Sequence, residues 1–454
     1  MKRKQILYLK EWKDRDNRRP LIIRGARQVG KTYLVRQFAN QEFENLLEIN
    51  FDLTPSKAKI FENSNIDEIL KLLAIDNHID IIPGKTLLFF DEIQATPQII
   101  AKLRYFYELK PELHIISAGS LLDFTLANHE YSMPVGRIEY MFMGPMLYSE
   151  FLLANNENAL LDYITDYSLP NQLPPLIHNK CLKYLKHYFF TGGMPAAVKA
   201  YISKDFNAVS FEHKIIIQTF MNDFSKYKKR CDTDLLRTVF TKIPTLVGNK
   251  IKYVNISQNH KAAALSEALS LLSMAKILHS VYHSSCNGVP LAGELNEKIF
   301  KTIFLDIGLL LSILKLSISD LELEENLITV NSGALAEQFI GQHLLSLYRN
   351  YEEPHLYYWH RMKNGASSEI DYAIENNRRI IPIEVKAGKT GSLKSLQVFV
   401  SKKDSDIAVR FNADLPSTIN TKTSIPKISD KEYKLLSLPL YMVEELPKIL
   451  SENI

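Results

Sequence analysis

Two glycines and a lysine–threonine pair form the part of the sequence with the clearest chemical pattern. The segment reads Leu21-Ile22-Ile23-Arg24-Gly25-Ala26-Arg27-Gln28-Val29-Gly30-Lys31-Thr32, an apolar run followed by a glycine-bounded loop. Gly25 and Gly30 permit backbone turns closed to other residues, so that successive N–H groups can hold phosphate oxygens at the start of a helix. Lys31 would reach the β- and γ-phosphates, and the Thr32 hydroxyl would bind Mg²⁺. The pattern is typical of a P-loop; the alternative is a strand–helix turn whose lysine faces solvent.

A pair of acids closes the apolar run of residues 86–90. Asp91 and Glu92 are placed as expected for a central parallel strand with ligands at its carboxyl end. Asp91 would hold Mg²⁺ through water, and Glu92 would orient the attacking water. The alternative is a core strand whose acids begin a surface turn. The predicted cofactors are ATP and Mg²⁺, and the predicted nucleotide contacts of the loop are Gly25, Ala26, Arg27, Gln28, Val29, Gly30, Lys31, Thr32 and Tyr33.

Two serines and an arginine are further candidates for the phosphate site. Ser117 ends the next strand, expected at residues 113–117, and is the first candidate for sensing the γ-phosphate, with Ser120 second. These hydroxyls could equally cap the helix expected at residues 121–126. Arg137 follows Gly136 and could reach the γ-phosphate of a neighbouring subunit as an arginine finger, although a solvated arginine is the commoner outcome.

A second chemical pattern lies in the C-terminal third of the chain. Strands are expected at residues 355–361, 368–374 and 379–386, with a hairpin turn at residues 375–378. That turn brings Asp371 within about two residues of the level of Glu384, and alternation places Glu384 and Lys386 on one face. Two carboxylates and a lysine suit metal-dependent phosphodiester cleavage. Cross-strand charge pairing on an exposed strand edge explains the same residues without chemistry.

Length and composition bound the organisation of the chain. The chain has 454 residues, 46% of them hydrophobic and 23% charged, with a net charge of +4. This length suggests about three domains, and the near-balanced charge by itself predicts neither a nucleic-acid binder nor a binder of acidic membranes. Cys181, Cys231 and Cys286 are odd in number and widely separated, which fits a reducing cytoplasm. No segment approaches the run of about 18 apolar residues that spans a membrane, so we expect a cytoplasmic location and no membrane partner.

The elements that must position these residues predict a multidomain α/β protein. We expect a P-loop domain with a parallel sheet at residues 1–150, a helical lid at 151–205, a winged-helix-like domain at 206–325 and an α/β domain at 326–454. The winged helix is indicated by three helical patterns followed by strand-like runs at residues 275–282 and 301–306. Its basic residues are either a solvated face or a DNA-contacting face; they are Lys226, Lys228, Lys229, Arg230, Lys242, Lys250, Lys252 and Lys261.

Several of these motifs together resemble a known family. The loop GARQVGKT, the strand LLFFDEIQ, the turn SAGS, the Gly136-Arg137 step and the sequence Gly192-Gly193-Met194-Pro195 resemble the AAA-type ATPases of bacteria and archaea that end in a domain of unknown function. The resemblance implies an AAA-type sheet with a helical lid, in which Pro195 contacts the adenine base. The alternative for Pro195 is a simple break between two helices.

The C-terminal pattern resembles a second family. Asp371, twelve intervening residues and Glu384-Val385-Lys386 resemble the PD-(D/E)xK nuclease signature. This resemblance implies a restriction-endonuclease-like α/β fold for residues 326–454, with Glu337 as the acid that the first helix supplies. Ile370 stands where the signature has proline, and this is a departure from it.

We therefore expect an ATPase whose P-loop domain, lid and winged helix control a nuclease-like domain. Lys31, Glu92 and Arg137 are the predicted catalytic residues for ATP hydrolysis, and Asp371, Glu384 and Lys386 for DNA or RNA cleavage. The predicted metal ligands are Thr32 and Asp91 in the first site, and Glu337, Asp371 and Glu384 in the second. The alternative is a nucleotide-dependent switch or DNA-binding regulator whose nuclease fold is inactive and docks partners. DNA and a second copy of the chain are candidate partners.

Overall fold

The structure of the chain is a computed structural model that describes residues 1–62, 65–120, 122–126, 136–227, 230–316, 332–363, 366–388, 393–425 and 430–453. It contains two compact units. Unit 1 comprises Met1–Pro145 and the short segments Met274–Lys276 and Arg349–Glu353. Unit 2 comprises Met146–Ser273, Ile277–Tyr348 and Pro354–Ile454.

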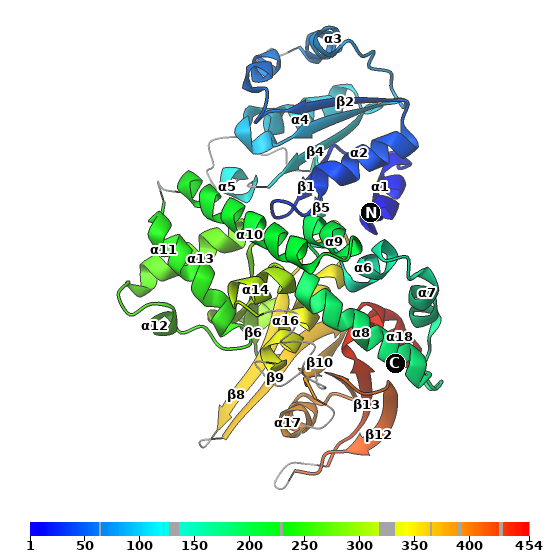
Figure 1. The fold of residues 1–454 in the computed structure, drawn as a ribbon, viewed down its shortest axis with the longest axis vertical. Coiled ribbons are helices and arrows are strands. Elements are labelled where there is room, and N and C mark those ends of the chain that lie inside the picture. Colours follow the sequence, from blue (N-terminus) through cyan, green and yellow to red (C-terminus); the bar gives the residue numbers. More distant parts are fainter. Residues whose placement is uncertain are drawn as a thin grey trace. The chain divides into compact units, whose positions relative to one another are not determined.

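Unit 1 is built on a five-stranded parallel sheet with the strand order β2-β3-β4-β1-β5 (Figure 1). The strands are β1 (Leu21–Arg24), β2 (Asn45–Asn50), β3 (Thr86–Asp91), β4 (His114–Gly119) and β5 (Glu139–Phe142). The helices are α1 (Gln5–Lys13), α2 (Lys31–Glu42), α3 (Ile66–Asn77), α4 (Gln98–Leu109) and α5 (Leu122–Leu126), with 3₁₀ turns η1 (Pro55–Glu62) and η2 (Ile93–Ala95). This sheet confirms the α/β fold expected for the P-loop domain.

Burial explains why the strands of unit 1 read as continuous apolar runs. Every residue of β3 is buried, as expected for a parallel strand covered on both faces. Phe90 packs with Phe61 and with Phe106 of α4 in the apolar core of the unit. This packing fixes the carboxyl end of β3, where the two acids lie.

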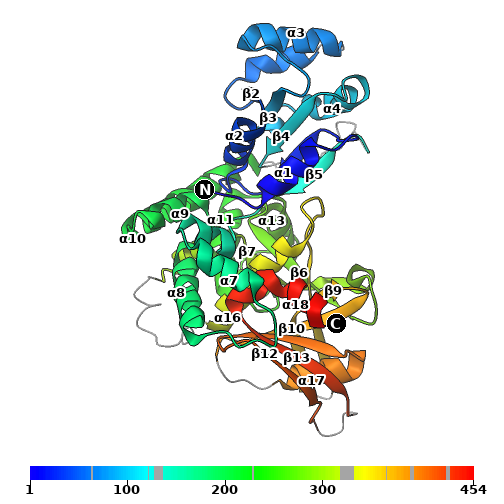
Figure 2. The same cartoon turned by 90° about the vertical axis from the view of Figure 1, so that its right-hand side faces the viewer.

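Unit 2 is built on an eight-stranded mixed sheet with the order β12-β13-β11-β10-β9-β8-β6-β7 (Figure 2). The strands are β6 (Leu278–Ser284), β7 (Leu295–Phe304), β8 (Leu356–Lys363), β9 (Ala366–Asn376), β10 (Arg379–Val385), β11 (Ile407–Asn412), β12 (Ser417–Lys422) and β13 (Glu432–Pro439). Trp359 and Ile370 on the sheet pack against Phe399 and Val400 of α17 (Lys394–Lys403), which therefore covers one face.

The remaining helices of unit 2 precede, interrupt and follow this sheet. They are α6 (Tyr148–Ala154), α7 (Asn158–Asp166), α8 (Pro175–Thr191), α9 (Pro195–Ile202), α10 (Phe206–Asp223), α11 (Thr233–Lys242), α12 (Tyr253–Ile256), α13 (Ala262–Met274), α14 (Ile307–Ile313), α16 (Ser332–Leu344) and α18 (Leu446–Asn453), with 3₁₀ turns η3 (Phe224–Tyr227), η4 (Ile243–Leu246), η5 (Leu291–Glu294), η6 (Leu345–Leu347) and η7 (Leu440–Glu445). No helix in the described ranges is long and apolar enough to cross a membrane.

The hairpin expected to form the wing of a winged helix is part of the large sheet. Strands β6 and β7 pair antiparallel, and β6 also pairs in parallel with β8. The segment expected as the winged-helix-like domain therefore shares one sheet with the segment expected as the nuclease-like domain. A pattern of apolar residues identifies strands but does not say which strand each one joins.

Candidate functional site

The phosphate-binding pattern of unit 1 adopts the strand–loop–helix geometry that its sequence predicts. Strand β1 ends at Arg24, the loop follows, and α2 begins at Lys31 directly after Gly30, whose φ is 96°. A Cβ atom at Gly25 would lie 2.1 Å from the backbone oxygen of Met143. Glycine is therefore required at Gly25 because the loop packs directly against another backbone segment.

The Lys31 ammonium is held inside the loop. Its Nζ donates hydrogen bonds to the backbone oxygens of Gly25 (2.9 Å) and Ala26 (2.8 Å). Burial lowers the pKa of Lys31 to about 8, and the nearby Glu92 and Asp91 carboxylates partly offset this effect. A cation is thus buried against the loop at the start of a helix, and a cation at a helix N-terminus suits an anionic ligand.

Oxygen donors from the loop and from β3 lie together. The Thr32 hydroxyl donates a hydrogen bond of 2.9 Å to Oδ2 of Asp91, and the Asn50 side-chain amide donates one of 3.4 Å to the same oxygen. Burial raises the pKa of Asp91, although the bond from Thr32 opposes that shift. A hydroxyl beside a carboxylate fits the small, oxygen-seeking Mg²⁺ ion, so these residues fit the metal that a P-loop site uses.

Glu92 is placed beside the sensor turn. It adopts a left-handed backbone conformation (φ 53°), and its Oε2 accepts hydrogen bonds from the side chains of Gln94 and Ser120, the latter at 3.4 Å. Ser117 is fully buried, and its Oγ has no hydrogen-bond partner in the part of the chain that is described. The structure thus gives Ser120 a contact with Glu92, and the sensor role of either serine remains a prediction.

Three other predicted residues have different partners or belong to the other unit. Arg137 is half-exposed and forms an ion pair with Glu108, 3.1 Å from its Nε. Tyr33 is exposed, and its hydroxyl accepts a hydrogen bond from the N-terminal amine (3.0 Å). Pro195 is the first residue of α9 in unit 2. Their proposed roles, as arginine finger, nucleotide contact and base contact, remain predictions.

Three further residues contact the loop or its acids without having been predicted from the sequence: Arg3, Asn50 and Gln94. Arg3 is buried, and its guanidinium donates to the backbone oxygens of Val29 (2.8 Å) and Gly144 (2.7 Å), which ties the loop to the segment that packs on it. Nothing in the basic N-terminal sequence predicts this contact of Arg3. Asn50 could have been found, because it ends the strand that pairs with β3 and stands level with Asp91.

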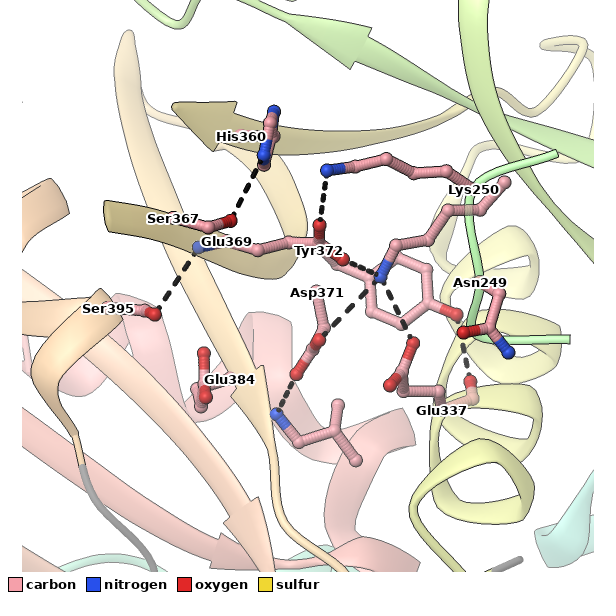
Figure 3. Close-up of polar contacts among 12 residues, drawn as sticks. Asn249, Lys250, Glu337, His360, Ser367, Glu369, Asp371, Tyr372, Glu384 and Ser395 are labelled. Carbon is pink, nitrogen blue, oxygen red and sulfur yellow. Dashed lines mark hydrogen bonds and ion pairs between the residues drawn. The ribbon is translucent and has the colours of Figure 1, made fainter. Parts of the chain in front are cut away.

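In unit 2 three predicted residues of the second pattern, Glu337, Asp371 and Glu384, gather around one region of the sheet (Figure 3). The fourth, Lys386, forms an ion pair with Glu384. The last pair of the β9–β10 ladder is Tyr372 and Ile383. Asp371 and Glu384 are the next residues on the two strands, beyond this pair. The turn consists of Asn377 and Arg378, both with positive φ, and is shorter than the four-residue turn that we expected. As a result, Asp371 and Glu384 come level with each other instead of two residues apart.

Hydrogen bonds fix these carboxylates in place. Asp371 Oδ2 accepts a hydrogen bond of 2.7 Å from the backbone N–H of Val385, and Glu384 forms an ion pair with Lys386. The Tyr372 hydroxyl donates to the backbone oxygen of Glu337 (2.9 Å), which links β9 to α16. Glu337, Asp371, Glu384 and Lys386 therefore converge as the sequence pattern predicts.

Three residues that the sequence analysis did not assign to this site complete it. Lys301 of β7 is buried, and its Nζ lies 2.5 Å from Glu369, 3.3 Å from Glu337 and 3.9 Å from Asp371. Lys250 lies 3.0 Å from the other carboxylate oxygen of Glu369. We call the seven residues the acidic cluster; they are Lys250, Lys301, Glu337, Glu369, Asp371, Glu384 and Lys386. The sequence feature that could have pointed to Lys301 is a single lysine within the apolar run Ile-Phe-Lys-Thr-Ile-Phe-Leu.

The buried charged groups of the acidic cluster shift one another's pKa values. Burial and the Asp371 carboxylate raise the pKa of Glu337 to about 8 and that of Glu384 to about 7. Burial alone would lower the pKa of Lys301, but Glu337, Asp371 and Glu369 more than offset it, so this pKa is raised. The ammonium of Lys301 is therefore firmly charged. It lies beside Glu369, whose pKa is lowered by Lys301 and Lys250 against the effect of burial, and beside Glu337, whose pKa is raised.

The acidic cluster does not fit a divalent metal ion as it stands. Within the described ranges, no group of three or more His, Cys, Asp or Glu side chains is arranged to hold a metal ion. The Lys301 ammonium lies among the carboxylates that the sequence pattern predicts as ligands. Metal binding by Glu337, Asp371 and Glu384 thus conflicts with the lysine that the fold delivers to them.

The basic residues considered for DNA contact are partly paired. Lys226 lies 3.1 Å from Asp223, and Lys250 belongs to the acidic cluster. Lys228 and Lys229 lie outside the described residues. The DNA-binding face therefore remains a prediction.

Comparison with protein families divides the chain into three parts. Residues 17–152 match the family described as AAA domain. Residues 182–320 and 332–441 match two domains of unknown function, DUF8612 and DUF4143. No curated protein matches the chain.

Solved structures similar to the chain include proteins of Pyrococcus abyssi and Aeropyrum pernix. The Walker-type ATPase PABY2304 of Pyrococcus abyssi shares 15% identity, with 68% of this chain and 94% of that chain covered and a TM-score of 0.42. The Aeropyrum pernix ORC2 protein in its ADPNP–ADP complexes shares 12% identity, with 67% and 89% covered and a TM-score of 0.36. These TM-scores are below 0.5, whereas the family match and the strand–loop–helix geometry both indicate a P-loop domain. Residues 17–152 of the chain therefore form a P-loop ATPase domain of the AAA type.

Proposed function

We propose that the chain binds ATP with Mg²⁺ in unit 1 and hydrolyses it. The observation that carries this proposal is the 2.9 Å hydrogen bond from Thr32 of the loop to Asp91 at the end of β3. It joins the two elements that a nucleotide·Mg²⁺ complex needs, with Lys31 on one side and Glu92 on the other. Lys31 would bind the β- and γ-phosphates, Thr32 and Asp91 would hold Mg²⁺, and Glu92 would orient the attacking water.

Phosphate release tests the hydrolytic step. Glu92→Gln removes the water-orienting carboxylate and keeps the shape of the side chain, so we expect turnover to fall by at least about 100-fold while ATP still binds. Glu62→Gln makes the same chemical change at an exposed acid of unit 1 and serves as the matched control. Unchanged phosphate release by Glu92→Gln would remove Glu92 from the mechanism.

For the C-terminal half we propose a binding function that the nucleotide state of unit 1 controls. Of the two functions that the sequence pattern permits, the position of Lys301 favours a docking or DNA-binding module over a metal-dependent nuclease. DNA affinity measured with ATP and with ADP tests this proposal, because a nucleotide-controlled binder should differ between the two states. Mg²⁺-dependent nicking of DNA that Asp371→Ala abolishes would restore the nuclease function instead.

A further inference from the structure

We infer that Lys301 is a built-in cation that takes the place of a divalent metal ion in the acidic cluster. The wild-type cluster then binds no divalent ion, and loss of this one ammonium group opens a metal site. The inference concerns unit 2 alone and does not depend on ATP hydrolysis in unit 1.

The first support is the position of the ammonium group. Its three carboxylate neighbours come from two elements, since Glu337 lies on α16 and Glu369 and Asp371 lie on β9. A metal ion in a two-carboxylate site bridges separate elements in the same way. The Lys301 Nζ also lies 5.3 Å from the centre of the ring of Tyr358 on β8, the strand next to β9, so it reaches across the sheet from β7. The ammonium therefore fills the centre of the cluster and does not lie at its edge.

The second support is that the carboxylate oxygens already have partners. Asp371 Oδ2 accepts the Val385 N–H, Glu384 Oε1 pairs with Lys386, and the two oxygens of Glu369 pair with Lys301 and Lys250. The exception among these is Glu384 Oε2, which is buried and has no hydrogen-bond partner among the described residues. A divalent ion takes about six oxygen ligands, water included. Of the oxygens named here, Glu384 Oε2 alone is unpartnered in the described part of the chain, so an ion would gain a second carboxylate ligand among them when an ammonium group leaves.

The third support is the balance of charge. The cluster holds four carboxylates, Glu337, Glu369, Asp371 and Glu384, against three ammonium groups, Lys250, Lys301 and Lys386. With all groups ionised the excess is one negative charge, which a single proton can neutralise. Without Lys301 the excess becomes two negative charges, which matches one divalent ion.

Lys301 is also fixed in place. It lies on β7, where it pairs with Val281 of β6, and its side chain is 4% exposed. Displacing its ammonium would leave buried carboxylates without a counter-charge. It would also leave the ammonium buried without an anionic partner, and both changes cost free energy. An added metal ion is therefore a poor competitor for the site in the wild-type chain.

Mn²⁺ binding to the full chain, without nucleotide, tests the inference. Free Mn²⁺ is measured by electron paramagnetic resonance during titration of the wild type and of Lys301→Met. This substitution keeps an unbranched apolar stem and removes the terminal ammonium group. We expect Lys301→Met to bind one Mn²⁺ per chain at least about 10-fold more tightly than any site of the wild type. Adding Asp371→Asn to Lys301→Met should remove that site. Lys448→Met is the matched control, because its ammonium bonds the backbone oxygens of Thr165 and Tyr167 outside the cluster.

Three outcomes would overturn the inference. The first is a Mn²⁺ site in the wild type that Asp371→Asn abolishes, whether or not Lys301→Met folds. The second is a folded Lys301→Met protein that binds Mn²⁺ no better than the wild type. The third is a Lys301→Met protein that stays unfolded with Mn²⁺ present at about 1 mM, since an ion in place of the ammonium should restore the cluster by mass action.

Discussion

The sequence Gly192-Gly193-Met194-Pro195 gives a sharp test of the packing in unit 2. A Cβ atom added at Gly193 would lie 2.0 Å from the backbone oxygen of Met146 and 2.8 Å from its nitrogen. Gly193 also takes part in two short hydrogen bonds. Its oxygen accepts the Met146 N–H (2.6 Å), and its own N–H donates to Oδ2 of Asp306 (2.6 Å). Gly193→Ala therefore cannot be accommodated without moving one of these backbone segments.

The size of the effect follows from these contacts. An ordinary carbon–oxygen contact is about 3.4 Å, so the backbones must separate by more than about 1 Å. That movement breaks both hydrogen bonds. A buried neutral bond contributes about 1 kcal/mol and a bond to a charged group about 1.5 to 3 kcal/mol. Burial raises the pKa of Asp306 to about 6, so it accepts as a carboxylate at neutral pH. We expect Gly193→Ala to lower the free energy of unfolding of unit 2 by about 2.5 to 4 kcal/mol.

Denaturant unfolding at pH 7.5 measures this loss in one unit at a time. The chain has two tryptophans, Trp12 in unit 1 and Trp359 in unit 2, and both are buried. In a Trp12→Phe background, fluorescence reports Trp359 alone. Gly288→Ala is the matched control, since a Cβ there meets nothing within 4 Å; it should change the free energy by less than about 1 kcal/mol. A loss of less than about 1 kcal/mol in Gly193→Ala would refute the steric reasoning.

Three further predictions follow from single contacts. Burial and Asp371 raise the pKa of Glu337 to about 8. The folded chain therefore binds more protons than the unfolded chain between pH 6.5 and 8. As a result, the free energy of unfolding of unit 2 should fall as pH rises through this window. Glu337→Gln should reduce this dependence of the free energy of unfolding on pH, as measured by unfolding at pH 6.5 and pH 8. An equal dependence in the variant would show that a different group titrates. If Arg137 acts on a neighbouring subunit, Arg137→Ala mixed with Lys31→Ala should recover part of the lost rate of phosphate release, whereas no recovery leaves Arg137 in its ion pair with Glu108. Asn65 caps α3 by accepting from the N–H groups of Asp67 and Glu68, so Asn65→Ala should cost unit 1 about 1 kcal/mol by Trp12 fluorescence, and an unchanged midpoint would contradict the cap.

The nucleotide site could be predicted from the sequence because each signal is local. The glycines, Lys31 and Thr32 lie within one loop, and Asp91 and Glu92 end one apolar strand. The carboxyl ends of parallel strands lie at the same edge of their sheet, and β1 and β3 are separated there by β4 alone, so the two motifs come together. Arg3 could not be predicted, because its bonds to Val29 and Gly144 depend on how distant segments pack.

The acidic cluster was only half predictable for the same reason. Asp371, Glu384 and Lys386 share one hairpin, so their convergence follows from short-range pairing. Lys301 arrives on β7, and its place depends on the pairing of β6 with β8, a long-range contact that no local pattern reveals. The sequence predicted that the segments of β6 and β7 form strands. It did not predict that β6 pairs with β8.

Calorimetric titration of ATP with Mg²⁺ into the wild type and Lys31→Ala tests the P-loop site most directly. Lys31 supplies the cation buried inside the loop, and losing its charge-assisted bonds to two phosphates should cost about 3 kcal/mol, or at least about 100-fold in Kd. We predict one ATP site per wild-type chain and weak or undetectable binding by Lys31→Ala. Equal affinity in the two proteins would contradict the assignment of this loop as the nucleotide site.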